Sequence, residues 1–302
     1  MDKKYLLVAD IGGTRIRMSF VGLHTSEIPN KTQEYWTSML NGSDALAVLK
    51  RLLHEYIEKS GIYPIGIVIG LPGVVAPDND QVLMCNNIPA LTGHMLASEL
   101  RGNLVCPIYI GHDTKLLLAG ELSTLSGYDD EIALGVFFGT GVGADVLMRN
   151  KECSIFEYGL ELGHLPLSLN GERCVCGKIG CAETFISGHN LQTISDAFNI
   201  PIQTVFSHWE EDSMLALRLK EFVDYQAMVL AIAVSIIQPT LLIIGGGIVS
   251  MDGYPKEALK KSLNIHLLNH IPRRRLSIVW GQHGNKAGFY GGEYLFRERF
   301  EK

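Results

Sequence analysis

The chain has 302 residues, of which 47% are hydrophobic and 19% are charged, and its formal net charge is −6. This composition excludes a largely disordered protein and predicts a globular one with one large or two medium domains. The negative charge argues against a nucleic-acid partner, because the run Arg273–Arg275 is too short to form a basic patch. We interpret that run as a solvated turn before a strand at 276–280.

The predicted compartment is the cytoplasm, because Met1–Lys4 leads directly into a short apolar run instead of a signal peptide. The longest apolar stretch, Met228–Ile237, is about half as long as a membrane span, so we expect a buried helix and no membrane partner. In a reducing compartment, clustered cysteines hold metal or perform redox chemistry more often than they form disulfides. Cys85, Cys106 and Cys153 stand alone and are expected to be packing residues.

The first predicted elements are two strands, at 5–10 and 15–21, that form a hairpin around the turn Ile11–Thr14. Apolar residues at helical spacing predict a helix over 45–60. Further strands are expected at 65–69 and 108–110, and a helix is expected from Thr114 to about Leu125.

The opening pattern then returns, because a strand at 132–138, a glycine turn at 139–143 and a strand at 144–148 form a weak repeat of residues 6–20. This repeat predicts two related α/β domains that face each other. A helix over 227–237, a strand over 241–244, a glycine turn at 245–247 and a closing helix over 288–300 complete the prediction. We place one domain at 1–113, closed by the C-terminal helix at about 288–302, and the other at 114–287.

Two glycine turns are candidates for binding a polyphosphate, because glycine lets backbone N–H groups approach a phosphate closely. The candidate residues are Gly12, Gly13 and Thr14 in the first turn, and Gly139, Thr140 and Gly141 in the second. The alternative is that these glycines serve only the geometry of hairpin turns. Neither turn has the spacing or the lysine of a P-loop.

Asp10 lies at the tip of a predicted buried strand, beside the first glycine turn. A carboxylate in this position is suited to hold Mg²⁺, usually through water. Its alternative role is to cap the turn.

The segment 164–183 contains one histidine and three cysteines, which are His164, Cys174, Cys176 and Cys181. One imidazole and three thiolates suit a tetrahedral structural zinc site with no open position for water. A redox pair is the alternative, although Cys174 and Cys176 lack the two-residue spacer of the common oxidoreductase motif.

Polar residues accompany the cysteines and follow one of the strands. Glu161 and Glu183, together with His164, present several acceptors that suit a ligand with several hydroxyls, whereas solvated glutamates are the ordinary alternative. Asp113 ends the strand at 108–110, where it caps the helix that follows or acts as a base toward a substrate hydroxyl; the two roles are compatible.

These motifs together resemble the ROK family of bacterial sugar kinases and repressors over nearly the whole chain. The resemblance implies a two-domain actin-like, ribonuclease H-like ATPase fold with an interdomain cleft. The stretch 174–183 is similar to the zinc signature of the family, and 161–164 is similar to its E-x-G-H motif. The two glycine turns, with Asp10, resemble its phosphate motifs, and Gly246 and Gly247 lie where the family contacts adenosine.

The same resemblance implies that Asp113 is the general base and that the sugar ligands are Asn87, His112, Asp113, Glu161, His164 and Glu183. It implies an ATP-dependent kinase for the primary hydroxyl of a hexose, with ATP, Mg²⁺ and structural Zn²⁺ as cofactors and a dimer or tetramer as the assembly. His112 stands where the family usually has asparagine, and Ala144 and Asp145 stand where glycines are common. His112 replaces a residue that contacts the sugar in the family, so this departure bears on the identity of the sugar more than on activity.

D-Allose is the first candidate substrate, on the similarity of 245–248 and 254–257 to the D-allose kinase branch. Glucokinase, fructokinase and N-acylhexosamine kinase remain alternatives within the family. A non-catalytic sugar-binding regulator is the alternative from another class, and a phosphohydrolase or acid-sugar enzyme on the same fold is a third. Because the first strand is expected at residue 5, we expect no helix-turn-helix domain.

Overall fold

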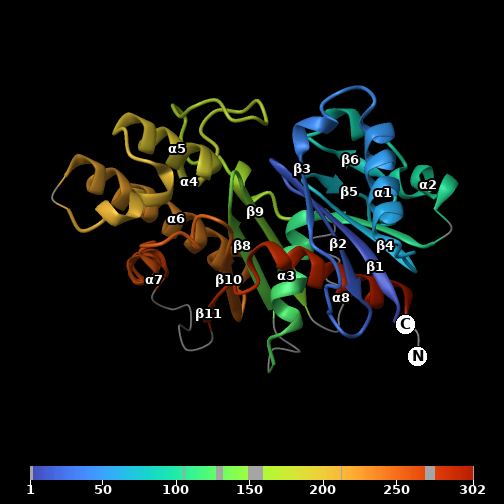
Figure 1. The fold of residues 1–302 in the computed structure, drawn as a ribbon. Helices are drawn as coiled ribbons and strands as arrows, with labels where there is room; N and C mark the ends of the chain where they lie inside the picture. The colour runs from blue at the N-terminus through green and yellow to red at the C-terminus, as the bar shows by residue number, and fades with distance from the viewer. Residues whose placement is uncertain are drawn as a thin grey trace. The chain divides into compact units, whose positions relative to one another are not determined.

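The computed structural model describes residues 3–104, 106–126, 132–148, 159–211, 213–268 and 276–301. The chain divides into two compact units (Figure 1). The first unit comprises Met1–Gly127, Cys153–Gly159 and Asn285–Lys302, and the second comprises Tyr128–Glu152 and Leu160–Gly284. The first unit therefore continues past the predicted boundary at residue 113. The turn predicted at Arg273–Arg275 and the predicted packing of Cys153 lie outside the described residues.

The first unit is built on a five-stranded sheet with the order β3-β2-β1-β4-β7. Its strands are β1 (Tyr5–Ile11), β2 (Arg15–Gly22), β3 (Gln33–Trp36), β4 (Gly66–Leu71) and β7 (Ile108–His112). β1 and β2 form the predicted antiparallel hairpin, and β4 and β7 continue the sheet in parallel with β1. The short strand β3 was not predicted.

Both faces of β1 are covered, which explains why its sequence is a continuous apolar run. Leu7, Ala9 and Ile11 belong to a core shared with α1 (Ala45–Ser60), whose buried residues recur at helical spacing. α1 ends at Gly61, which adopts the left-handed conformation (φ 68°) and donates its N–H to the carbonyl of Ile57.

The opposite face of the sheet is covered by α3 (Asp113–Ser123) and α8 (Ala287–Phe300), which lie side by side in Figure 1. The two helices cross where each has a glycine. A β-carbon on Gly120 would overlap the carbonyl of Ala287, and one on Gly291 would overlap the carbonyl of Leu116. This backbone contact is why the helix that begins at Asp113 belongs to the first unit.

The connection between β4 and β7 carries smaller elements. These are β5 (Val74–Val75), β6 (Val82–Met84), η2 (Pro89–Leu91), α2 (Leu96–Leu100) and η3 (Arg101–Asn103), while η1 (Thr37–Leu40) follows β3. β5 and β6 pair as a small antiparallel hairpin. Cys85 follows this hairpin in the core, and Cys106 packs against the same core, as predicted for both cysteines.

The second unit has a four-stranded sheet with the order β11-β10-β8-β9. Its strands are β8 (Ile132–Phe138), β9 (Val142–Met148), β10 (Leu241–Gly245) and β11 (Ser277–Trp280). β8 and β9 form an antiparallel hairpin, and β10 and β11 run parallel to β8. The hairpin followed by parallel strands repeats the pattern of the first unit, in agreement with the repeat predicted from the sequence.

The remaining elements of the second unit are η5 (Leu162–His164), α4 (Glu183–Ile186), α5 (Gly188–Ala197), η6 (Ile202–His208), α6 (Met214–Ile237) and α7 (Lys256–His266). The short η7 (Gly284–Lys286) begins at the last residue of this unit and continues into the first unit. The prediction for α6 was wrong in extent, because only 227–237 was expected. Ser213 caps the true start by accepting a hydrogen bond from the N–H of Ala216. In the described part of the chain, no helix has the length and hydropathy of a membrane span.

Candidate functional site

The first glycine turn joins β1 to β2 and is fixed by hydrogen bonds. The N–H of Gly12 donates to the carbonyl of Arg15 at 2.9 Å, which closes the turn. Thr37, directly after β3, donates its hydroxyl to Gly12 O at 2.8 Å and its N–H to Thr14 O at 3.0 Å. Two hydrogen bonds from Thr37 therefore hold the turn predicted to bind phosphate, and no sequence motif indicated this residue.

Asp10 lies at the end of β1, on the face covered by α8, and only 6% of the residue is exposed. A β-carbon on Gly288, in the first turn of α8, would lie 2.9 Å from the carboxyl carbon of Asp10. Burial raises the pKa of Asp10 to about 7, the charge of Asp113 adds to this effect, and Arg17 opposes it. A buried carboxyl with a second carboxylate nearby is a set of hard oxygen donors that fits Mg²⁺, and a cation there would favour the ionised form.

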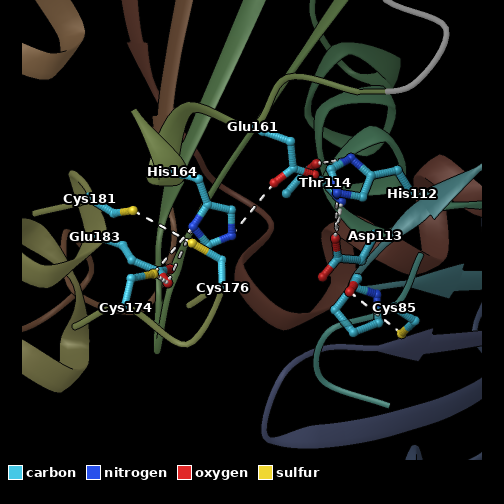
Figure 2. Close-up of polar contacts among 11 residues, drawn as sticks. Cys85, His112, Asp113, Thr114, Glu161, His164, Cys174, Cys176, Cys181 and Glu183 are labelled. Carbon is cyan, nitrogen blue, oxygen red and sulfur yellow. Dashed lines mark hydrogen bonds and ion pairs between the residues drawn. The ribbon is translucent and has the colours of Figure 1, made fainter. Parts of the chain in front are cut away.

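Asp113 is the first residue of α3, and its predicted place as the N-cap was wrong because His112 occupies the N-cap position. Its Oδ1 accepts a hydrogen bond from the N–H of Thr114 at 2.8 Å and lies 3.6 Å from His112 Nε2. His112 Nδ1 lies 2.8 Å from the hydroxyl of Thr114. The two nitrogens of His112 therefore face Thr114 and Asp113, so the ring is held beside the predicted base (Figure 2).

Asn87 lies against the first glycine turn, and Gly70 lies between Asp10 and Asp113. The side-chain nitrogen of Asn87 lies 3.2 Å from the position of a β-carbon on Gly13, so this amide packs against the glycine turn. A β-carbon on Gly70, in β4, would lie 3.3 Å from Asp113 Cα and 3.7 Å from Asp10 Oδ1. The structure thus brings together the candidate residues of the first unit at the ends of three neighbouring strands, β1, β4 and β7.

The second glycine turn joins β8 to β9 and meets the start of α5. Gly188 donates its N–H to the carbonyl of Gly139 at 2.8 Å. A β-carbon on Gly141 would lie 2.9 Å from Glu183 Oε2, so a side chain there would displace the Glu183 carboxylate. A predicted hydroxyl ligand therefore lies directly beside the second predicted phosphate turn.

The third glycine turn follows β10 and packs on the end of β8. Gly246 has a φ of 98°, and a β-carbon there would overlap the backbone of Phe138. Ile248 donates its N–H to the carbonyl of Phe138 at 3.0 Å. Because Phe138 directly precedes Gly139, the third turn adjoins the second.

The histidine and cysteine cluster forms as predicted. The ligand atoms of His164, Cys174, Cys176 and Cys181 all lie within 4.8 Å of one another. His164 Nδ1 is 3.4 Å from Cys174 Sγ, and the sulfurs of Cys176 and Cys181 are 3.6 Å apart (Figure 2). Ligands of a tetrahedral zinc ion are separated by roughly 3.5–3.8 Å, so these four residues fit the metal.

The loop that holds the sulfurs has the geometry of a metal-binding knuckle. Cys174 donates its N–H to Lys178 O at 2.8 Å and accepts from the N–H of Gly177 at 2.9 Å. Gly177 and Gly180 have φ values of 87° and 69°, which favour glycine. Burial, together with the Glu183 carboxylate, raises the pKa of Cys174, so ionising this thiol needs a cation at the cluster.

His164 links the cluster to the two predicted hydroxyl ligands. Glu183 Oε1 lies 3.7 Å from His164 Nδ1 and accepts a hydrogen bond from Cys174 Sγ at 3.0 Å. Glu161 Oε2 lies 3.7 Å from His164 Nε2. With Nδ1 turned to the cluster, Nε2 and the two carboxylates remain as polar groups fixed by the same loop.

A match to a protein-family model identifies the family of the chain. A model described as the ROK family matches residues 7–299. The chain belongs to the ROK family. An N-acetyl-D-glucosamine kinase of Citrobacter koseri is 26% identical to it over 309 residues, covering 95% of this chain and 97% of that protein.

Two solved ROK structures share the fold. A glucokinase from Streptomyces griseus, in complex with glucose and AMPPNP, has a TM-score of 0.81 at 21% identity and covers 98% of this chain and 100% of that chain. A hexokinase from Thermus thermophilus has a TM-score of 0.73 at 22% identity, with 100% of both chains covered. These findings confirm the predicted family, the predicted fold and the predicted enzyme class, a sugar kinase.

The ROK relatives described above give no support to D-allose in particular. The interdomain cleft, the roles of the individual site residues, the two metals, the assembly and the compartment stay predictions. Several contributors had no usable sequence signal, since Thr37, Gly70 and Gly288 reach the site only through the fold.

Proposed function

We propose that the chain is an ATP-dependent kinase that phosphorylates the primary hydroxyl of a hexose, with Asp113 as the general base. The observation that carries this proposal is the grouping at one end of the first sheet. Asp113 and Asp10 flank Gly70, and Asn87 packs on Gly13 of the glycine turn. A base, a cation-binding carboxyl, a sugar ligand and a phosphate-binding turn are the parts that phosphoryl transfer to an alcohol needs.

In the proposed reaction, Asp113 accepts the proton of the sugar hydroxyl as its oxygen attacks the γ-phosphorus of ATP. A phosphorus–oxygen bond forms to the sugar, the bond to the bridging oxygen of ADP breaks, and ADP leaves. Mg²⁺, when bound near Asp10, would neutralise charge on the phosphates. The ring of His112 lies beside this carboxylate, with Nε2 3.6 Å from Asp113 Oδ1.

The proposed roles in the second unit concern binding. Glu161, His164 and Glu183 would accept hydrogen bonds from hydroxyls of the sugar, and the zinc site would keep their loop rigid. Gly139, Thr140 and Gly141 would contact phosphates, and Gly246 and Gly247 would contact the adenosine. Glu183 supports a link between these roles, because its carboxylate lies against Gly141.

Two sugars lead the substrate candidates. D-Allose follows from the sequence around 245–257, and N-acetyl-D-glucosamine follows from the name of the Citrobacter koseri relative. The two ligands differ at C2 and C3, which the acceptors of a hexose site contact directly, so a sugar panel separates them.

The test combines that panel with an Asp113→Asn variant. The wild type should release ADP with one of D-allose, N-acetyl-D-glucosamine, D-glucose or D-fructose, and the variant should lose about 10²–10⁴-fold in turnover while calorimetry still detects sugar binding. His112→Asn, which introduces the residue usual in the family, serves as the comparison and should change sugar preference more than turnover.

The outcomes separate the competing functions. Near-normal turnover in Asp113→Asn would show that this residue is not the base. Sugar binding by the wild type without turnover on any hexose would favour a regulator. ATP hydrolysis without a phosphorylated sugar would favour a phosphohydrolase.

A further inference from the structure

Strand β7, which leads into Asp113, lies at the edge of its sheet. On its outer side, an edge strand has N–H and C=O groups without a neighbouring strand, so they need other hydrogen-bond partners. On this edge, Ile110 donates its N–H to the carbonyl of Asn79 at 3.4 Å and accepts a hydrogen bond from Asn79 Nδ2 at 3.0 Å. One residue therefore satisfies both backbone groups of Ile110, three positions before the proposed base.

Asn79 lies in the turn between β5 and β6, and its neighbours hold that turn in place. Its φ of 61° is left-handed, a conformation that asparagine tolerates better than most residues. Asp78 Oδ1 accepts from the N–H of Asp80 at 3.0 Å, and Asp80 Oδ1 accepts from the N–H of Ser98 at 2.8 Å. The turn is thus attached to α2 through Asp80 and to β7 through Asn79.

The chain that leaves this turn leads to the proposed sugar ligand of the first unit. β6 spans Val82–Met84, and Asn87 follows it and packs on Gly13. Cys85, between them, donates to the carbonyl of Pro72 at 3.7 Å. The segment 79–87 is therefore bonded to the strand of the base at one end and rests on the phosphate turn at the other.

We propose that Asn79 is a positioning residue that fixes the β5–β6 hairpin to β7 and so sets the distance between Asn87 and Asp113. This role rests on the proposed function, because it assumes that those two residues meet the same sugar. The hydrogen bond to Ile110 O needs a side-chain donor, so left-handed backbone geometry alone does not explain the amide of Asn79. A glycine would meet the backbone requirement but would make only one of the two bonds.

The experiment uses Asn79→Asp and Asn79→Gly in the full chain. Asn79→Asp replaces the donor with an oxygen that repels Ile110 O, whereas Asn79→Gly removes the side chain and keeps the backbone geometry. Asn199→Asp is the matched control, since Asn199 is also left-handed (φ 54°) but lies in the turn after α5, in the second unit.

Both Asn79 variants should raise the KM for the preferred hexose by about five- to tenfold, as expected for losing one hydrogen bond, and leave the KM for ATP within about twofold. Asn199→Asp should change neither constant. The assays belong well below the melting temperature of each variant. Unchanged hexose KM in both variants, or equal increases for hexose and ATP, would overturn the positioning role.

Amide hydrogen exchange gives a second readout that does not depend on catalysis. Peptides covering 79–88 should exchange faster in both Asn79 variants than in the wild type and in Asn199→Asp. If the wild type phosphorylated no hexose, the proposed function would fail, while faster exchange in that segment would still support the attachment. Unchanged exchange would overturn it.

Discussion

The carboxyl group of Asp10 lies against Gly288, at the start of α8, although the two residues are far apart in the sequence. A side chain at position 288 would occupy the space of the carboxyl group. The close approach seals Asp10 from water, and burial is the main reason that its pKa rises to about 7. The folded protein therefore keeps a proton on Asp10 under conditions in which the unfolded chain has lost it.

This relationship predicts how the stability of the metal-free protein depends on pH. The pKa of Asp10 rises from 3.8 to about 7 on folding, so its contribution to stability is present below about pH 4 and is lost as pH increases toward 7. Asp10→Asn cannot ionise. The variant should match the wild type near pH 4 and melt at least about 3 °C higher at pH 8, while losing kinase activity. Asp224→Asn, at an exposed site on α6, is the control and should show no pH-dependent difference. Parallel melting curves for Asp10→Asn and the wild type across this range would contradict the prediction.

Gly13→Ala should impair the binding of the sugar. The new β-carbon would lie 3.2 Å from Asn87 Nδ2, which forces the amide to move by a few tenths of an ångström. We expect the hexose KM to rise by about tenfold, because small misplacements of a ligand are costly. Steady-state kinetics measures the change, with Gly102→Ala as the control, since a β-carbon at 102 meets open space. Equal kinetics in the two variants would show that Asn87 does not need its present position.

The cysteine cluster should hold about one zinc ion per chain, detectable by metal analysis of the purified protein. Cys181→Ser removes a fully buried ligand and should lose the metal, lower the melting temperature and reduce hexose phosphorylation by about ten- to hundredfold. Cys106→Ser, outside the cluster, should keep its zinc. Full zinc content in Cys181→Ser would show that another set of residues binds the ion.

The crossing of α3 and α8 should tolerate no side chain at Gly120. A β-carbon there overlaps the carbonyl of Ala287, and backbone atoms of a packed helix cannot move away cheaply. Gly120→Ala should destabilise the first unit by about 1–3 kcal/mol, measured by urea unfolding against Gly102→Ala. Activity should fall as well, because α3 begins with Asp113 and α8 begins beside Asp10. Wild-type stability in Gly120→Ala would mean that the helices can separate at little cost.

The parts of the fold that follow from local pattern were predictable. α1 was predicted with its exact limits, since its apolar spacing lies within the helix and Gly61 directly follows its last residue. The cysteine cluster was also predictable, because three of its four ligands lie within eight residues of one another. The first half of α6 was missed, because between Met214 and Gln226 polar residues interrupt the apolar run that revealed the second half.

The parts of the site that depend on distant contacts were not predictable. Nothing in the sequence near Asp10 indicates Gly288, and nothing near Ile110 indicates that Asn79 will cover its edge. The position of Asp113 was predicted one residue too early in the helix, because the sequence does not reveal whether the chain turns helical before or after an acidic residue.

The first unit includes the segment Asn285–Lys302, so its fold has a consequence for synthesis. Until α8 leaves the ribosome, Leu6 and Val8 on β1 have no cover on one face, although the opposite face can already pack against α1. A nascent chain therefore carries a partly exposed apolar sheet while the second unit is translated, because α3 covers β4 and β7 on that face. Chaperones that recognise such surfaces should engage it in that interval and release it when the last helix docks.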